Sequence, residues 1–297
     1  MKQTIFTGTA TALITPFSAD GKEVDYASFE HLVNFQVDNC ADALVVAGTT
    51  GEAPVLTATE KSELIKLAKI NCGHIPVIAG TGSNNTEEAV IKSNEAEKQG
   101  VDGLLIVTPY YNKCTQQGLI DHYFYIADRV STPIIIYNVP SRTGVDILPE
   151  TYCALSEHKN IVAVKDATGN ISSFNRSVIC GKDLAFYAGN DDLLVEMMCY
   201  GAKGVISVVS NIIPAIIKRI TEACINNQFV NAAQLHKTYL NLMNSMFCEV
   251  NPIPIKAACS ALFGYNNTVR LPLNKISPGN EAKLREILSE AGLFAGA

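Results

Sequence analysis

A lysine follows a short apolar run, residues 161–164 (Ile-Val-Ala-Val), and the sequence Asp-Ala-Thr-Gly comes directly after Lys165. The run is typical of a buried strand, and the polar residues with glycine indicate the loop that follows. Burial of the lysine stem would disfavour the ammonium form, so the amine would become nucleophilic nearer to neutral pH, as a Schiff-base enzyme requires. Position alone favours the plainer alternative, a structural lysine that extends its amine to solvent.

Three other apolar runs end in groups that could act beside such an amine. Tyr137 ends one of them, and Arg142 follows five residues later; a phenol can transfer a proton, and a guanidinium can bind a carboxylate through two hydrogen bonds. Gly48-Thr-Thr-Gly51 ends another, and its hydroxyl and N–H donors suit a small carboxylate, although an ordinary glycine-bounded turn is an equal alternative. Pro109-Tyr-Tyr-Asn112 ends the third, where paired tyrosines favour packing or a subunit contact.

Together these groups suit imine formation with a 2-oxo acid, which needs a nucleophilic amine, a proton carrier and an anion site. The five histidines are isolated, and the nine cysteines are scattered without a C-x-x-C pair. This pattern predicts no zinc site and no disulfide framework, and it is typical of reduced cysteines in a cytoplasmic protein. We therefore expect aldol chemistry through an enamine, with no metal and no cofactor.

Eight strand-length apolar runs recur along the chain, each followed by glycine or polar residues. Continuous apolar runs indicate strands buried on both faces, as in parallel sheets. Helix-like stretches separate them, with a capping-box pair at Thr57 and Glu60 and a helix start at Asn85. The pattern predicts an α/β fold, a (β/α)8 TIM barrel over residues 1–228, followed by a C-terminal helical segment over residues 229–297. The alternative, a doubly wound sheet, would want a glycine-rich phosphate motif, which the sequence lacks. The predicted strands are 11–15, 43–47, 76–79, 104–107, 134–137, 161–164, 185–187 and 205–209.

Composition excludes two classes of partner. The chain has 297 residues, of which 47% are hydrophobic and 18% charged, and its net charge is −6. An acidic chain without a basic cluster is not expected to bind nucleic acid. No apolar run is long enough to cross a bilayer, and the residues after Met1 lack a signal-peptide pattern, so no membrane association is expected.

With these segments in hand, the chain resembles the pyruvate-dependent lysine Schiff-base aldolase family. The resemblance covers nearly the whole chain, and six motifs stand in the family's order. They are GTTGE at 48–52, PYYN at 109–112, YNVPSRTG at 137–144, VKDATG at 164–169, GVIS at 204–207 and NPIPIK at 251–256.

The resemblance implies a role for each matching residue. Lys165 would form the imine with pyruvate, and Tyr137 would donate and accept protons in a relay with Thr49 and Tyr111. Thr50 would hold the pyruvate carboxylate, Ile206 would make a backbone contact to pyruvate, and Arg142 would receive the carboxylate of L-aspartate 4-semialdehyde. In the family the tyrosine at the Tyr111 position crosses a subunit interface, so a homodimer would be the smallest complete unit and a dimer of dimers is expected.

Arg142 with Thr49-Thr50 favours condensation with the semialdehyde in diaminopimelate and lysine biosynthesis. The family alternatives are an N-acetylneuraminate lyase or a 2-keto-3-deoxy-sugar-acid aldolase, and a third alternative is a silent barrel that senses a 2-oxo acid. Lysine-inhibited members carry an effector cleft, whose positions Asn84, Glu88 and Tyr110 match. Ala58 and Lys61 replace its usual histidines, and Pro54 stands where a small residue is common. A second positive charge there opposes an ammonium effector, so weak or absent inhibition by lysine is expected.

Overall fold

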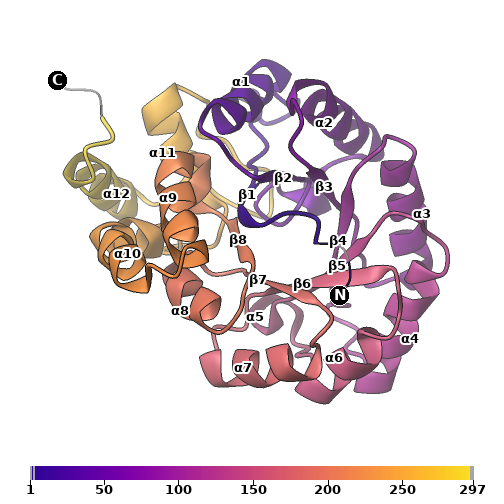
Figure 1. The fold of residues 1–297 in the computed structure, drawn as a ribbon. Coiled ribbons are helices and arrows are strands. Elements are labelled where there is room, and N and C mark those ends of the chain that lie inside the picture. Colours follow the sequence, from indigo (N-terminus) through magenta and orange to yellow (C-terminus); the bar gives the residue numbers. More distant parts are fainter. Residues whose placement is uncertain (1, 3, 295–297) are drawn as a thin grey trace.

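The computed structural model describes residues 2 and 4–294; residues 1, 3 and 295–297, at the ends of the two predicted ranges, lie outside the described residues. Eight parallel strands form a closed barrel in sequence order, and β8 pairs with β1 to close it (Figure 1). The predicted TIM barrel is therefore confirmed. The strands are β1 Gly8–Ala12, β2 Ala43–Val46, β3 Val77–Gly80, β4 Gly103–Val107, β5 Ile134–Asn138, β6 Ile161–Asp166, β7 Ala185–Ala188 and β8 Gly204–Ser207.

Helices surround the barrel and follow the start signals that the sequence carries. At the start of α2, the Glu60 N–H donates to the Thr57 hydroxyl at 3.1 Å, and the Thr57 N–H donates to the Glu60 carboxylate at 2.8 Å, which confirms the capping box. Asn85 caps α3. The helices of the ring are α1 Tyr26–Asp38, α2 Ala58–Asn71, α3 Thr86–Glu97, α4 Gln116–Ala127, α6 Pro149–Leu155, α7 Ile171–Cys180, α8 Leu194–Cys199 and α9 Pro214–Ile225. The short helix α5 Pro140–Thr143 lies in the connection between β5 and α6, and the 3-10 turns are η1 Ala53–Val55, η2 Asp191–Leu193 and η3 Val209–Asn211.

Three further helices follow α9: α10 Phe229–Ser245, α11 Ile253–Phe263 and α12 Pro278–Glu290. α10 packs against α8 and α9, and α12 packs against α10 and α11, on one side of the ring (Figure 1). The predicted boundary at residues 228 and 229 falls between α9 and α10, and the division into two parts stays a prediction. Among the described residues, no helix has both the length and the apolar character to cross a membrane.

The first strand lies earlier in the chain than its apolar run predicted. β1 covers Gly8–Ala12, whereas residues 13–15 leave the sheet, and the Ile14 N–H donates instead to the Asn211 side chain at 3.1 Å. Leu13 and Ile14 are apolar because they pack between the barrel and its helices, which the sequence does not distinguish from strand burial. The predicted range 11–15 was therefore wrong by about three residues.

The interior of the barrel and the layer between strands and helices form two separate apolar clusters. Successive side chains of a strand point to opposite faces. On β5, Ile135 and Tyr137 point into the barrel, and Ile136 between them points toward the helices. On β6, Ala163 points into the barrel and Val164 toward the helices, so Lys165 returns to the interior side. The carboxyl ends of β5 and β6 thus present Tyr137 and Lys165 to the same space.

Candidate active site

Lys165 and Tyr137 lie side by side at the barrel mouth. They are register partners on neighbouring strands, and the Lys165 Nζ atom lies 4.5 Å from the centroid of the Tyr137 ring. Lys165 is 5% exposed and Tyr137 is 7% exposed. Both are therefore held by the surrounding packing, and the amine does not reach bulk solvent as a snorkelling lysine would.

Burial sets the protonation of both groups. Desolvation lowers the pKa of Lys165 to about 8, the Arg142 charge acts in the same direction, and the Asp191 carboxylate opposes it. Desolvation raises the pKa of Tyr137, while Arg142 and the Thr49 hydroxyl oppose that rise. The result is an amine that is partly neutral close to neutral pH beside a phenol that keeps its proton, the pairing that amine attack with proton transfer needs.

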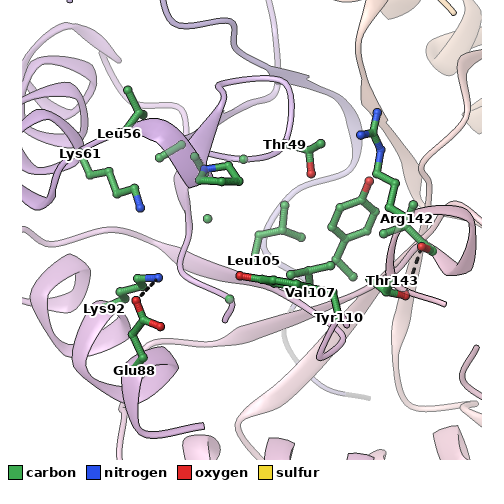
Figure 2. Close-up of a pocket in the computed structure, with 18 of the residues that line it drawn as sticks. Thr49, Leu56, Lys61, Glu88, Lys92, Leu105, Val107, Tyr110, Arg142 and Thr143 are labelled. Carbon is green, nitrogen blue, oxygen red and sulfur yellow. Dashed lines mark hydrogen bonds and ion pairs between the residues drawn. The ribbon is translucent and has the colours of Figure 1, made fainter. Parts of the chain in front are cut away.

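A cavity of about 560 Å³ opens beside Tyr137. Thr49, at the turn after β2, and Arg142, on α5, line it together with Tyr137, and Figure 2 shows the Thr49 hydroxyl and the Arg142 guanidinium on the same side of the cavity. Thr50 is not among the lining residues, and neither is Lys165, whose amine faces the Tyr137 ring.

Thr50 is 2% exposed and is held by a residue that the sequence analysis did not single out. The Asn251 side-chain amide donates to the Thr50 hydroxyl at 3.1 Å, and the Asn251 carbonyl accepts from the Arg142 guanidinium at 3.1 Å. Asn251 begins the NPIPIK motif, so the motif itself was the available signal. The segment before α11 thus joins the two predicted carboxylate-binding residues.

A buried ion pair also fixes the turn after β2 to α11. Glu52 and Lys256 form an ion pair at 2.6 Å in which each side chain is 1% exposed. The other Glu52 carboxylate oxygen accepts from the Arg270 N–H at 3.0 Å. Since a buried charge without its partner is strongly unfavourable, this pair ties the turn that carries Thr49 to the C-terminal helices.

Asp191, in η2 after β7, is the second functional candidate that sequence reasoning missed. It is 1% exposed, and its carboxylate accepts from the N–H groups of Val208 and Val209 at 2.9 and 3.0 Å. Burial raises the pKa of Asp191, and the charge of Lys165 opposes that rise. Inspection of the end of strand seven, Gly189-Asn-Asp191, would have drawn attention to it.

The two remaining predicted site residues are Ile206, which is buried in the barrel, and Tyr111, which is exposed outside the cavity. The Ile206 side chain, on β8, fills the barrel interior and is fully buried. Tyr111, after β4, is 91% exposed, does not line the cavity, and has a φ of 70°, a conformation that costs a non-glycine residue about 1–3 kcal/mol. A single chain therefore does not bring Tyr111 to Tyr137 and Thr49.

The far end of the cavity holds part of the predicted effector cleft. Glu88 and Tyr110 line it together with Pro54, Ala58 and Lys61. Asn84 is not a lining residue, and its backbone carbonyl accepts from the Asn112 side chain at 3.0 Å. Among the described residues, no group of three or more His, Cys, Asp or Glu side chains gathers closely enough to hold a metal ion.

The chain is similar to known proteins over nearly its whole length. The family model of the dihydrodipicolinate synthetase family matches residues 5–291. The 4-hydroxy-tetrahydrodipicolinate synthase of Fervidobacterium nodosum is 47% identical over 294 residues, which cover 98% of this chain and all of that protein.

Solved structures show the same relationship. The dihydrodipicolinate synthase of Thermotoga maritima superposes with a TM-score of 0.95 at 41% identity, over 98% of this chain and 100% of that chain. The enzyme of Acinetobacter baumannii complexed with pyruvate superposes with a TM-score of 0.96 at 40% identity, over 98% and 100% of the two chains. This chain belongs to the dihydrodipicolinate synthetase family.

Proposed function

We propose that the chain condenses pyruvate with L-aspartate 4-semialdehyde to give 4-hydroxy-tetrahydrodipicolinate, as a lyase-class step of diaminopimelate and lysine biosynthesis. The observation that carries the proposal is the buried Lys165 amine against the Tyr137 ring, at a cavity that also presents Arg142. The name of the Fervidobacterium nodosum relative, and the pyruvate in the Acinetobacter baumannii structure, support the same reaction.

The chemistry begins when the neutral Lys165 amine attacks C2 of pyruvate. The resulting carbinolamine loses water to give an iminium ion, and loss of a C3 proton gives the enamine. The enamine carbon then attacks the aldehyde carbon of the semialdehyde, whose oxygen takes up a proton. Finally the amino group of the adduct attacks C2, the bond to Lys165 breaks, and the ring closes with the lysine released.

The other groups divide the work of proton transfer and anion binding. Tyr137, with its proton retained by burial, donates to the departing hydroxyl and accepts protons in later steps, with Thr49 as its relay partner. Thr50 and the backbone at Ile206 bind pyruvate. Arg142 binds the carboxylate of the semialdehyde, since its planar guanidinium suits a carboxylate.

Coupled assays test this proposal directly. Pyruvate with the semialdehyde should be consumed in an assay coupled to the downstream reductase, and borohydride with pyruvate should add mass to Lys165 alone. Modification of Lys165 with no semialdehyde turnover, but with cleavage of N-acetylneuraminate or a keto-deoxy sugar acid, would point to a sister aldolase. An unmodified Lys165 would contradict both the condensation and the sister-aldolase activities, and a non-catalytic barrel that senses a 2-oxo acid would be the remaining alternative.

The pH dependence of the first step should follow the Lys165 amine. Because burial lowers the pKa of this amine to about 8, its reactive neutral form grows as pH rises toward that value. We expect kcat/KM for pyruvate to rise about tenfold per pH unit below about pH 8 and then to level off. Steady-state kinetics over this range will show where kcat/KM stops rising. A rise that continues to the ordinary pKa of a lysine would contradict the assignment of the reactive amine to the buried Lys165.

We further propose that the chain works as a homodimer, within a dimer of dimers, in which Tyr111 completes the site of the partner subunit. Its exposure of 91% and its left-handed backbone in a single chain support this role, since the ring is left open to contact a second chain. A tyrosine held at an interface would regain the cost of this conformation through contacts with the partner.

Mixed oligomers should show whether Tyr111 of one subunit serves the site of its partner. Lys165→Met chains and Tyr111→Ala chains, each with little activity alone, are expected to recover about one quarter of wild-type activity after random mixing. Half of the dimers then pair unlike chains, and one of their two sites has both its own lysine and the partner's tyrosine. Activity no higher than that of the Tyr111→Ala protein would place Tyr111 outside the exchange.

Inhibition by lysine should be weak or absent. Lys61 and Lys92 line the cavity beside Glu88, and Glu88 already forms an ion pair with Lys92 at 2.8 Å. An incoming lysine ammonium would meet two positive charges and a carboxylate that is already neutralised. Steady-state assays should give an inhibition constant well above the millimolar level, and a submillimolar constant would contradict this expectation.

We also propose a cytoplasmic location. All nine cysteines are free, three of them buried and four exposed. Exposed thiols persist in a reducing compartment, whereas an oxidising one would favour their pairing.

A further inference from the structure

The turn after β2 carries the two threonines of the site and lies between two residues with an uncommon backbone conformation. Ala47 before it and Glu52 after it have φ values of 52° and 54°, in the left-handed region that non-glycine residues rarely adopt. Such residues keep this conformation where the surrounding structure holds them, and they relax where it does not. The position of Thr49 and Thr50 therefore depends on the contacts that hold the turn.

The C-terminal part of the chain supplies such contacts at two points of the turn. The Lys256 amine pairs with one Glu52 carboxylate oxygen at 2.6 Å, and the Arg270 N–H donates to the other at 3.0 Å. The Asn251 side-chain amide donates to the Thr50 hydroxyl at 3.1 Å. The segment between residues 251 and 270 thus holds the turn at Thr50 and again at its end.

The Lys256 amine has a fixed position of its own. Its Nζ atom lies 4.0 Å from the centroid of the Phe17 ring, which is fully buried, and a cation over an aromatic ring is attracted to it. The guanidinium carbon of Arg270 lies 4.3 Å from the centroid of the same ring, and this guanidinium pairs with Glu60, in the first turn of α2, at 2.6 Å. The place of the Glu52 carboxylate is therefore set by α11 and its neighbours, and not by the turn alone.

Stability does not by itself explain a buried ion pair here, since apolar residues of similar volume often serve a fold equally well. Neither Lys256 nor Glu52 lines the cavity, and each side chain is 1% exposed, so any effect on a substrate has to pass through the turn. A binding group has to lie within about 0.5 Å of its productive position. We propose that Lys256 and Glu52 are positioning residues, which hold the turn so that the Thr50 hydroxyl meets the pyruvate carboxylate. This rests on the proposed function, in which Thr50 binds that carboxylate.

Neutralisation of both charges together tests the proposal and leaves no unpaired buried charge. In Glu52→Gln/Lys256→Met, the glutamine side-chain oxygen can still accept from the Arg270 N–H, and methionine keeps the apolar stem of the lysine. Glu52→Gln alone, assayed at about pH 9, is the second variant if the double variant folds poorly. Burial lowers the pKa of Lys256 to about 8 with the carboxylate beside it, so the amine is neutral at that pH once the carboxylate is gone.

An ion pair at the other end of β2 provides the matched control. Asp42 precedes the strand, and its carboxylate pairs with Lys218 and accepts from the Thr9 N–H at 2.8 Å, as the Glu52 carboxylate pairs with a lysine and accepts from a backbone N–H. Asp42→Asn/Lys218→Met therefore removes the same kinds of group at the amino end of the strand, away from the turn. It should leave pyruvate binding unchanged.

The pyruvate concentration that gives half-maximal borohydride trapping on Lys165 reports whether Thr50 is in place. We expect this concentration to rise about tenfold in Glu52→Gln/Lys256→Met and to change by less than about twofold in the control, since loss of one charge-assisted hydrogen bond has the larger scale. Thr50→Val should raise it about tenfold in the otherwise wild-type chain, but by no more than about twofold in the double variant, because the hydroxyl is already displaced there. A purely structural role would leave the two effects multiplicative.

Other results would overturn the proposal. An unchanged half-maximal concentration in the folded double variant would do so, and so would a full effect of Thr50→Val in that variant. An equal rise in the Asp42→Asn/Lys218→Met control would trace the effect to a general loss of stability. A wild type that traps no pyruvate would overturn the proposed function together with this proposal, whereas normal trapping by wild type without coupling between Thr50 and the ion pair would overturn this proposal alone.

Discussion

Replacement of Lys165 by methionine is expected to abolish pyruvate trapping and to lower turnover by about 10⁴-fold or more, the scale on which loss of a catalytic nucleophile is felt. Methionine fills a similar volume and keeps the apolar stem but has no amine, so Tyr137 and Arg142 keep their surroundings while the imine cannot form. Mass spectrometry after borohydride treatment and the coupled assay measure the two losses. Trapping that persists in Lys165→Met would assign the imine to another lysine.

The same substitution should make the folded chain more stable. Burial lowers the pKa of Lys165 from 10.5 to about 8, so the folded state disfavours the ammonium form that the unfolded state prefers. This cost, about 3 kcal/mol at most, is present in full below about pH 8 and disappears as pH rises from there toward the unfolded value. Methionine removes it, so the gain in Tm should be largest below pH 8 and should fade above it.

Lys203→Met is the matched control for both measurements. Lys203 precedes β8 and is exposed, and both of its described hydrogen bonds, one donated to Phe186 and one accepted from Gly8, are made by its backbone. Its replacement should leave turnover unchanged and should alter stability by no more than about 0.5 kcal/mol. A stability gain in both variants would reflect a general effect of removing positive charge and would contradict the burial argument.

The position of Lys165 could be predicted from the sequence, but its direction could not. The apolar run before it indicated a buried strand, and the count of strands placed it on β6 beside β5. A strand that is apolar on both faces has no alternation, so the sequence cannot say which residues point inward. The register shift between Ile134 and Ile135 adds to the difficulty, because Ile134 pairs with Ile161 while Ile135 pairs with Ala163.

Asn251 and Asp191 illustrate what a strand-end scan misses. Asn251 reaches Thr50 across 201 residues of sequence, and no local pattern reports such a contact. Asp191 follows a strand end as the other candidates do, but its influence on Lys165 comes from burial, which only the packed structure supplies. The exposed Tyr111 is the opposite case: the resemblance gave it a role that a single chain does not bring about.

Replacement of Arg142 by alanine is expected to damage semialdehyde turnover far more than imine formation. A bidentate pair with a carboxylate amounts to two charge-assisted hydrogen bonds of about 1.5–3 kcal/mol each, so kcat/KM for the semialdehyde should fall by about 10²–10⁴-fold. Arg142→Lys should lie between alanine and wild type, because it keeps the charge but not the planar pair of donors. Arg176→Ala, at an exposed arginine on α7, should leave both steps unchanged.

Trapping and turnover in Arg142→Ala should be compared with wild type at a pH where the effect of Arg142 on the Lys165 pKa no longer matters. The Arg142 charge helps to lower the pKa of the Lys165 amine, so its removal should raise that pKa and slow trapping at neutral pH for an electrostatic reason alone. At about pH 10 most of the amine is neutral in both proteins, and trapping by Arg142→Ala should come within about threefold of wild type while semialdehyde turnover stays low. The guanidinium also donates to the Asn251 carbonyl at 3.1 Å. Equal losses of trapping and turnover at high pH would therefore mean that Arg142 holds the Thr50–Asn251 side of the site in place and does not select the second substrate.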